Sequence, residues 1–269
     1  MTKKKKLTII LILLLIILFA LLAVSGYYII SWKIDNDKIK AIVKEFDNIP
    51  VVNVPEEKTQ IINPPKEEEQ ISDYWYYVGL PLTEVDLTDL KKENSDTVGF
   101  LSVGGTNINY PIVQAKNNDY YLNHSFKKEY NDAGWIYADY RNNMNTLDQN
   151  TIIYGHSRLD KSLFGTLRNI LKTSWTDKKE NYVIRMSTLN GNSLWQVFSV
   201  YKIKEESYYI TPKFSTDVEY ETWLGTMLKR SEFNFNTTIN VKDKVLTLST
   251  CYDTDGNRVV MHAKLIKTS

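Results

Sequence analysis

The sequence contains one cysteine, Cys251, which ends the run Val245–Cys251. Successive side chains of a β-strand point to opposite faces, so Thr247 and Ser249 share the face of Cys251, and the two leucines of the run point the other way. A free cysteine is most often a small buried apolar residue, but small polar neighbours on its own face favour a thiol at the edge of a groove. Because a thiolate is a strong nucleophile, this residue is the first candidate for covalent chemistry.

An arginine follows the cysteine at short range. The string between them, YDTDGN, contains Asp255-Gly256, which is favoured turn chemistry for a β-hairpin. Such a hairpin would fold Arg258 back beside Cys251, where its charge would favour the thiolate and could stabilise an oxyanion. A solvated charge at a strand end is the alternative reading of a lone arginine.

Thiol chemistry usually needs an acid–base partner, and histidine is the common choice because its pKa lies near neutrality. The chain has three histidines. His124 in YYLNHSF and His262 in VVMHAKL are typical of packed structural residues. His156 follows the strand-like string TIIYG and opens the polar loop HSRLDKS, and such loops commonly carry catalytic side chains. This pattern favours His156.

Other kinds of site find less support in the sequence. No pair of His or Cys residues has zinc-ligand spacing, and Gly104-Gly105 is not followed by the Lys-Ser/Thr of a phosphate-binding loop. We expect no metal, calcium included, and no other cofactor. Asp253 and Asp255 are interpreted as turn residues, with orientation of a catalytic partner by Asp253 as the less favoured alternative.

The amino terminus predicts a membrane anchor. Residues 7–30 are almost wholly apolar, and roughly 20 such residues cross the hydrocarbon core of a bilayer. A run of four lysines precedes this segment and aromatic residues follow it, which predicts a cytoplasmic tail at residues 1–6 and an extracellular remainder. A signal peptide cleaved near Ala23-Val24-Ser25 is the alternative, although signal sequences usually have shorter apolar regions of about 7–15 residues. An exported chain with one unpaired cysteine is unusual, which again draws attention to Cys251.

The rest of the chain divides into a short spacer and one large domain. Residues 31–70 predict a membrane-proximal helix at 34–46 and then a semi-extended linker rich in Pro and Glu. Residues 71–269 form a single candidate catalytic domain. With 33 basic against 32 acidic residues and 43% hydrophobic residues, the composition fits a packed core and carries no global signature of nucleic-acid binding.

Alternating runs separated by turn residues predict a mainly β domain. The expected strands cover residues 98–103, 108–113, 135–138, 151–154, 182–187, 193–203, 244–251 and 258–266. Helices are expected at 83–94, after a cap at Ser162, and at 216–230, where Thr216 and Glu219 have the spacing of a capping box.

Together these strings resemble the sortase family of cysteine transpeptidases. Residues 247–251, TLSTC, are similar to its T-L-x-T-C signature, and Arg258 stands where the family has its arginine. Residues 151–157, TIIYGHS, resemble the segment that carries the family's histidine. The similarity covers about residues 71–269. It is greatest to class B, through the segment from residue 98 to 126 and the predicted helix at 216–230.

The resemblance implies a closed eight-stranded sortase-type β-barrel with peripheral helices, and a reaction. Cys251 would attack the carbonyl carbon of a Thr in the carboxyl-terminal sorting signal of a secreted protein, and an amine of a peptidoglycan precursor would resolve the thioacyl enzyme. His156 would act as general acid and base and Arg258 as oxyanion donor. Ser249 and Thr250, with Tyr209 and Ile210, would contact substrate. Strand-end packing is the alternative for the last pair.

Two other functions remain open at this level. In a hydrolytic cysteine peptidase with the same dyad, water would hydrolyse the thioacyl intermediate. A non-catalytic, surface-anchored binding module would keep the barrel without using the thiol.

Overall fold

The computed structural model describes residues 3–65, 73–251 and 255–269, and of Cys251 it describes the backbone. The chain consists of two compact units, residues 1–41 and 42–269. The described residues of the first unit, 3–41, lie within helix α1 (Lys3–Glu45), which is continuous through the expected membrane span and nearly all of the expected membrane-proximal helix. No proline interrupts this stretch. α1 is long and apolar enough to cross a membrane by length and composition.

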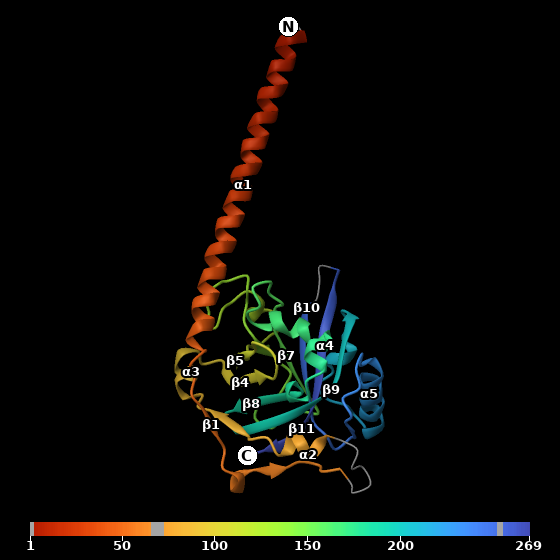
Figure 1. The fold of residues 1–269 in the computed structure, drawn as a ribbon. Coiled ribbons are helices and arrows are strands. Elements are labelled where there is room, and N and C mark those ends of the chain that lie inside the picture. Colours follow the sequence, from red (N-terminus) through yellow and green to blue (C-terminus); the bar gives the residue numbers. More distant parts are fainter. Residues whose placement is uncertain (1–2, 66–72, 252–254) are drawn as a thin grey trace. The chain divides into compact units, whose positions relative to one another are not determined.

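The second unit contains the closed barrel that the family resemblance implied, built from the strands that the alternating pattern predicted. Among the described residues, eight strands hydrogen-bond in the ring order β10-β7-β6-β5-β4-β8-β9-β11, and the β10–β11 pair closes it (Figure 1). The strands are β4 (Thr97–Val103), β5 (Asn109–Val113), β6 (Tyr137–Ala138), β7 (Asn150–Tyr154), β8 (Val183–Thr188), β9 (Gly191–Lys204), β10 (Val245–Cys251) and β11 (Asn257–Thr268). The β10–β7 and β5–β6 pairs are parallel, and the other neighbours in the ring are antiparallel.

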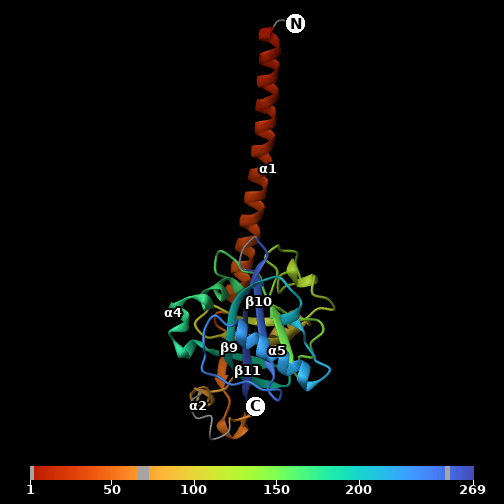
Figure 2. The same ribbon diagram turned by 90° about the vertical axis from the view of Figure 1, so that its right-hand side faces the viewer.

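Both faces of β10 are buried. Leu246 and Leu248 are completely shielded from solvent on one face. On the other face, Val245 packs against helix α5 (Asp217–Arg230), whose apolar side chains Tyr220, Trp223, Leu224 and Met227 cover the outer surface of β9, β10 and β11 (Figure 2). The predicted capping box begins this helix in modified form. Thr216 Oγ1 accepts the Glu219 backbone N–H, while the Glu219 carboxylate accepts the backbone N–H of Ser215.

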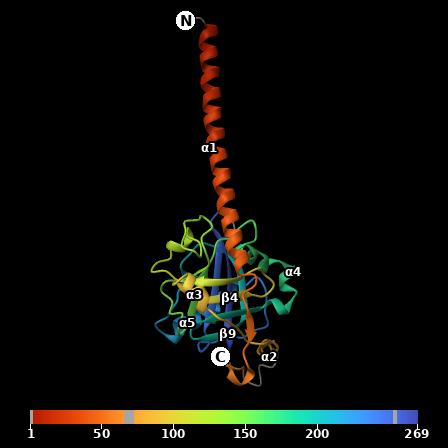
Figure 3. The same cartoon turned by 90° about the vertical axis from the view of Figure 1, so that its left-hand side faces the viewer.

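The predicted helix at residues 83–94 is only partly correct. Residues Thr83–Val85 form strand β3, which pairs with β1 (Val51–Asn53), and helix α3 covers only Thr88–Glu93. Asp86 ends the strand, because its carboxylate accepts the Thr88 backbone N–H and so makes a turn between the two elements. α3 then packs beside β4 (Figure 3).

The segment after Ser162 also differs from the prediction. It forms a 3₁₀ helix, η4 (Phe164–Leu171), followed by the short helix α4 (Thr173–Thr176). The Ser162 hydroxyl donates to Asp160 Oδ1 and does not cap the helix. Further 3₁₀ turns are η1 (Glu56–Lys58), η3 (Tyr120–Leu122), η5 (Lys179–Asn181) and η6 (Tyr208–Ile210), and α2 covers Tyr74–Val78.

The expected linker is less free than its composition suggests. In its described part, β1 pairs with β3, and β2 (Gln60–Ile61) adds to the edge of β11. Tyr74 donates its phenolic hydrogen to the Ile62 carbonyl, which further ties this segment to the domain. The described part of the predicted linker, residues 50–65, is therefore held against the domain by backbone pairing and a side-chain hydrogen bond. The Glu-rich run at 67–69 lies outside the described residues.

Candidate active site

Three neighbouring strand ends carry the predicted chemistry. β10 and β11 form the expected hairpin, and its register puts Cys251 directly opposite Arg258. On the other side of β10, the parallel pairing with β7 aligns Ser249 with Tyr154, so the end of β7 lies beside the end of β10. His156 follows that end immediately. The Gly155 backbone N–H donates to the Ser249 carbonyl at 3.4 Å, which extends the pairing toward the histidine.

A pocket of about 290 Å³ lies at these strand ends. It is lined by six of the predicted site residues: His156, Tyr209, Ile210, Ser249, Thr250 and Arg258. The Cys251 side chain lies outside the described part of the chain, as does Asp253. Other lining residues, which the sequence did not single out, are Asn118, Asp119, Leu122, Tyr137, Tyr154, Gly155, Glu205 and Glu206. These come from strands, a 3₁₀ turn and loops between residues 118 and 206, so no single local pattern identified them.

Both the imidazole ring and the backbone of His156 are held by hydrogen bonds. His156 Nε2 lies 2.8 Å from the Leu122 carbonyl oxygen, and since a carbonyl only accepts, this nitrogen carries the proton. The His156 carbonyl accepts the Phe164 backbone N–H at 3.2 Å. Gly155 packs so closely on the Phe164 ring that a Cβ there would lie 2.8 Å from it. The histidine therefore has a defined position at the pocket rim.

Arg258 is paired with an acidic residue that the sequence did not point to. Its Nη2 donates to Glu205 Oε2 at 2.6 Å. Glu205 is brought there by the β9–β11 pairing, since its own backbone N–H donates to the Gly256 carbonyl. The arginine side chain is 21% exposed and the glutamate 67%. The guanidinium is thus oriented at the pocket by a partner that remains open to water.

The predicted substrate-contacting residues lie on the wall formed by η6 and β10. Tyr209 is buried, and its hydroxyl lies 3.0 Å from Ser249 Oγ. Burial raises the pKa of Tyr209, while the hydrogen bond with Ser249 acts in the opposite direction. Thr250 is also buried, and its hydroxyl has no hydrogen-bond partner among the described residues. This wall therefore combines an apolar surface with hydroxyl groups.

The two other histidines are structural, as expected. His124 stacks on the Tyr120 ring and its Nδ1 lies 2.7 Å from the Tyr120 carbonyl. His262 is fully buried between Tyr201 and Thr247. Neither lines the pocket. Within the described residues, no group of three or more His, Cys, Asp or Glu side chains could hold a metal ion.

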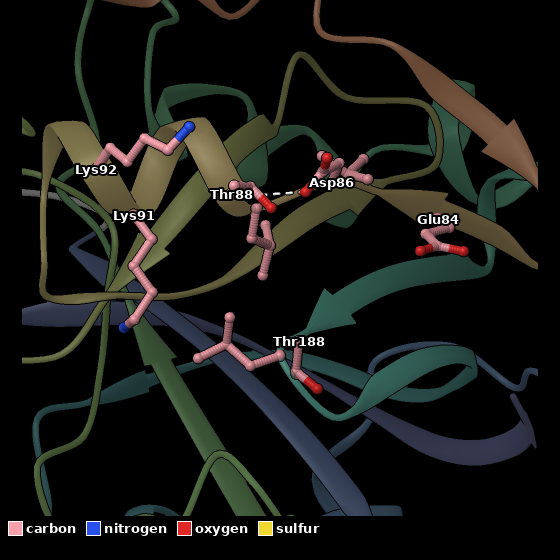
Figure 4. A pocket seen from close by; sticks show the side chains of 9 residues that line it. Glu84, Asp86, Thr88, Lys91, Lys92 and Thr188 are labelled. Carbon is pink, nitrogen blue, oxygen red and sulfur yellow. Dashed lines mark hydrogen bonds between the residues drawn. The ribbon is translucent and has the colours of Figure 1, made fainter.

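A second hollow, of about 460 Å³, lies between β3, α3 and the end of β8 (Figure 4). It is larger, but none of the predicted site residues lines it. Its two lysines are already engaged: Lys91 donates to the Ser95 and Thr97 carbonyls, and Lys92 pairs with Asp89. The candidate chemistry thus lies in the smaller pocket.

Comparisons with known proteins agree with this arrangement. A sortase domain model matches residues 101–266. The chain is 38% identical to sortase B of Staphylococcus aureus over 183 residues, which are 67% of this chain and 74% of that protein. This chain belongs to the sortase family. Sortase B of Listeria monocytogenes is also 38% identical, over 184 residues.

The solved structures most similar to this sortase include class B enzymes. The crystal structure of S. aureus sortase B matches with a TM-score of 0.64 at 38% identity, over 68% of this chain and 87% of that one. Sortase B from B. anthracis in complex with AAEK1 matches with a TM-score of 0.68 at 33% identity, over 87% and 99% of the two chains. The chain is therefore a class B-like sortase-type cysteine transpeptidase, and the sequence-based assignment of family and fold is confirmed.

Proposed function

We propose that Cys251 is the nucleophile, His156 the general acid and base, and Arg258 the donor to the reacting carbonyl oxygen. The observation that carries this proposal is the alignment of three strand ends, with Arg258 opposite Cys251 and His156 at the end of the parallel neighbour. His156 and Arg258 also line one pocket. These are the groups that an acyl transfer through a thioester requires.

In the proposed reaction, the Cys251 thiolate attacks the carbonyl carbon of a Thr in a sorting signal. Arg258 stabilises the oxyanion, and the bond after the Thr breaks as His156 gives a proton to the departing amine. The Thr carbonyl is then held as a thioester. An amine of a peptidoglycan precursor attacks this thioester, His156 takes the proton, and a new amide bond releases the thiolate.

The proposed substrate lies in the pocket against Tyr209, Ile210, Ser249 and Thr250. S. aureus sortase B has been solved in complex with a substrate, which supports the expectation that a pocket of this fold accepts a peptide.

The proposed location is the outer face of the cell membrane. α1 would span the bilayer at residues 7–30, with residues 1–6 in the cytoplasm because of their lysines. Residues 31–70 would connect the membrane span to the catalytic domain. That domain, residues 71–269, would lie outside the cell, where secreted proteins and peptidoglycan precursors are present.

The test uses the full chain in detergent micelles, a library of x-P-x-T-x peptides that includes NPQTN, and an amine nucleophile. The proposal expects a new amide product and an acyl adduct on Cys251 detected by mass spectrometry. Release of only the free acid at saturating amine would instead identify a hydrolytic peptidase. Failure of every peptide to modify Cys251, with no loss of cellular phenotype in Cys251→Ala, would support a binding module.

Variants separate the three roles. Cys251→Ala should abolish the adduct, and His156→Gln should lower turnover by about 10²–10⁴-fold, the usual contribution of general acid–base catalysis. Arg258→Lys keeps the charge but loses the planar fork of donors, so it should reduce turnover while leaving the thiol open to alkylation. Unchanged turnover in either of the last two variants contradicts its assigned role.

A further inference from the structure

Asp139 is a completely buried carboxylate directly after β6, close to the pocket but not in its lining. Arg141 donates to it three times, through its backbone N–H at 2.9 Å, Nε at 2.8 Å and Nη2 at 2.7 Å. The Tyr154 hydroxyl donates to Oδ2 at 2.9 Å and the Asn118 amide at 3.1 Å. Burial alone raises the pKa of Asp139, but these hydrogen bonds outweigh it and the pKa is lowered. Asp139 is therefore an ionised acceptor with five donors.

The donors belong to separate walls of the pocket. Tyr154 ends β7, immediately before Gly155 and His156, and Asn118 lies in the loop before η3; both line the pocket. Asn118 is held a second time, because its Oδ1 accepts the Tyr140 backbone N–H at 3.0 Å. A single carboxylate thus fixes both the strand end that leads to the histidine and the loop before η3, whose Leu122 carbonyl contacts His156.

Arg141 extends the same network to a third wall. Its Nη2, besides contacting Asp139, donates to the Ile210 carbonyl at 2.9 Å. η6 is also attached by Asn150, whose Nδ2 donates to the Tyr209 and Thr211 carbonyls, and by Trp223, whose indole N–H donates to the Tyr208 carbonyl. These contacts hold η6 to β7 and to α5. The Arg141 bond holds it to the Asp139 side of the pocket.

We propose that Asp139 and Arg141 are positioning residues that set the distance between the His156 side and the Tyr209–Ile210 side of the pocket. This inference rests on the proposed function of that pocket and adds to it two residues that do not touch the substrate. A buried ion pair by itself is weak evidence of stabilisation. Here the pair connects three pocket walls through named hydrogen bonds, which gives it a role in the geometry of peptide binding.

The decisive variant is Arg141→Lys. A lysine keeps the positive charge near Asp139 but lacks the fork that contacts the carboxylate twice and the Ile210 carbonyl once. Asp139→Asn is a harsher change because it leaves the guanidinium without its carboxylate. The matched control is Arg185→Lys, since Arg185 is also a partly buried arginine with a bond to a backbone carbonyl, that of Pro81, and does not line the pocket.

Two readouts on the full chain in micelles test the proposal. Hydrogen exchange followed by mass spectrometry needs no substrate: Arg141→Lys should speed exchange at least tenfold in residues 150–156 and 207–212, and leave the interior of α5 unchanged. Steady-state kinetics with a sorting peptide should show KM raised about tenfold, since small misplacements of binding groups are costly, with kcat and the pH profile of Cys251 alkylation little changed. Arg185→Lys should alter none of these.

Each result has a distinct meaning. Unaltered exchange in both segments overturns the positioning role, whether or not any peptide is turned over. Faster exchange with an unaltered KM overturns the link to peptide binding and leaves a purely structural ion pair. A wild-type chain that processes no peptide defeats the proposed function, and the exchange data still decide whether Arg141 holds the two segments together.

Discussion

His262 should make the stability of this sortase depend on pH. It is fully buried, and burial, with a smaller contribution from the charge of Arg230, lowers its pKa from 6.5 to about 3. Its hydrogen bonds explain how a neutral ring is held. Thr247 Oγ1 donates to Asn150 Oδ1 at 2.6 Å, so the hydroxyl accepts from His262 Nδ1 at 2.8 Å. The other ring nitrogen then accepts from the Tyr201 hydroxyl at 2.8 Å.

The sign and size of the effect follow from proton linkage. Below pH 6.5 the unfolded chain protonates this histidine and the folded chain does not, so the stability is present at neutral pH and is lost as pH falls from 6.5 toward 3. At about 1.4 kcal/mol for each pH unit, the loss between pH 7 and pH 5 is about 2 kcal/mol. This value hardly changes if the folded pKa is one unit higher, because the folded chain is still unprotonated at pH 5.

The assay is urea unfolding of the full chain in micelles, followed by tryptophan fluorescence at pH 7, 6 and 5. His262→Gln removes the titrating ring and retains a polar side chain. At pH 7 the variant should be less stable than wild type by about 1–3 kcal/mol, the usual cost of disturbing buried hydrogen bonds. At pH 5 the difference should shrink by about 2 kcal/mol, as wild type loses the stability that the variant never had. An equal difference at both pH values would refute the reasoning.

Three further predictions concern a helix cap, the histidine loop and the arginine. Thr216→Ala removes the side-chain acceptor for the Glu219 N–H and should destabilise the chain by about 1 kcal/mol in the same urea titration. Thr222→Ala, on the exposed face of α5, is the control and should have a smaller effect. Gly155→Ala would place a Cβ 2.8 Å from the Phe164 ring, so turnover should fall through displacement of His156, and unaltered kcat/KM would contradict that account. Glu205→Gln removes the negative partner of Arg258, so the pH at half-maximal alkylation of Cys251 should move down. Glu232→Gln serves as the control, because Glu232 accepts the Lys202 backbone N–H and does not line the pocket.

The strands of the barrel were predicted well because they carry their own signals, whereas their closure into a barrel was expected from the family resemblance. Alternation and turn chemistry located all eight strands to within a few residues, and the capping pattern at Thr216 located α5. The failures arose where a distant partner decides the local structure. Thr83–Val85 is a strand because β1 pairs with it, and the proline-rich segment at 50–65 is ordered by β3 and β11. The sequence pattern within either segment does not indicate which distant strand it pairs with.

The same distinction applies to the candidate site. Strand parity and the turn at Asp255-Gly256 were enough to bring Arg258 opposite Cys251, since hairpin partners are close in sequence. Glu205 and Asp139 were missed. Glu205 reaches Arg258 through the β9–β11 pairing, and Asp139 meets Asn118 and Tyr154 across separate loops. An acidic residue in a polar loop has no local feature that distinguishes such a role from ordinary solvation.

His156 shows where local reasoning reaches its limit. It was chosen among three histidines because it follows a strand, and then through resemblance to a family. The physical reason is the parallel pairing of β7 with β10, which brings the carboxyl ends of both strands to one edge of the barrel. The antiparallel β11 begins at that same edge. A histidine after one strand, a cysteine at the end of the next and an arginine at the start of the third therefore lie at one edge of the barrel. The parallel pair that brings them there joins β7 and β10, which are separated by 90 residues of chain, and no local signal in the sequence contains it.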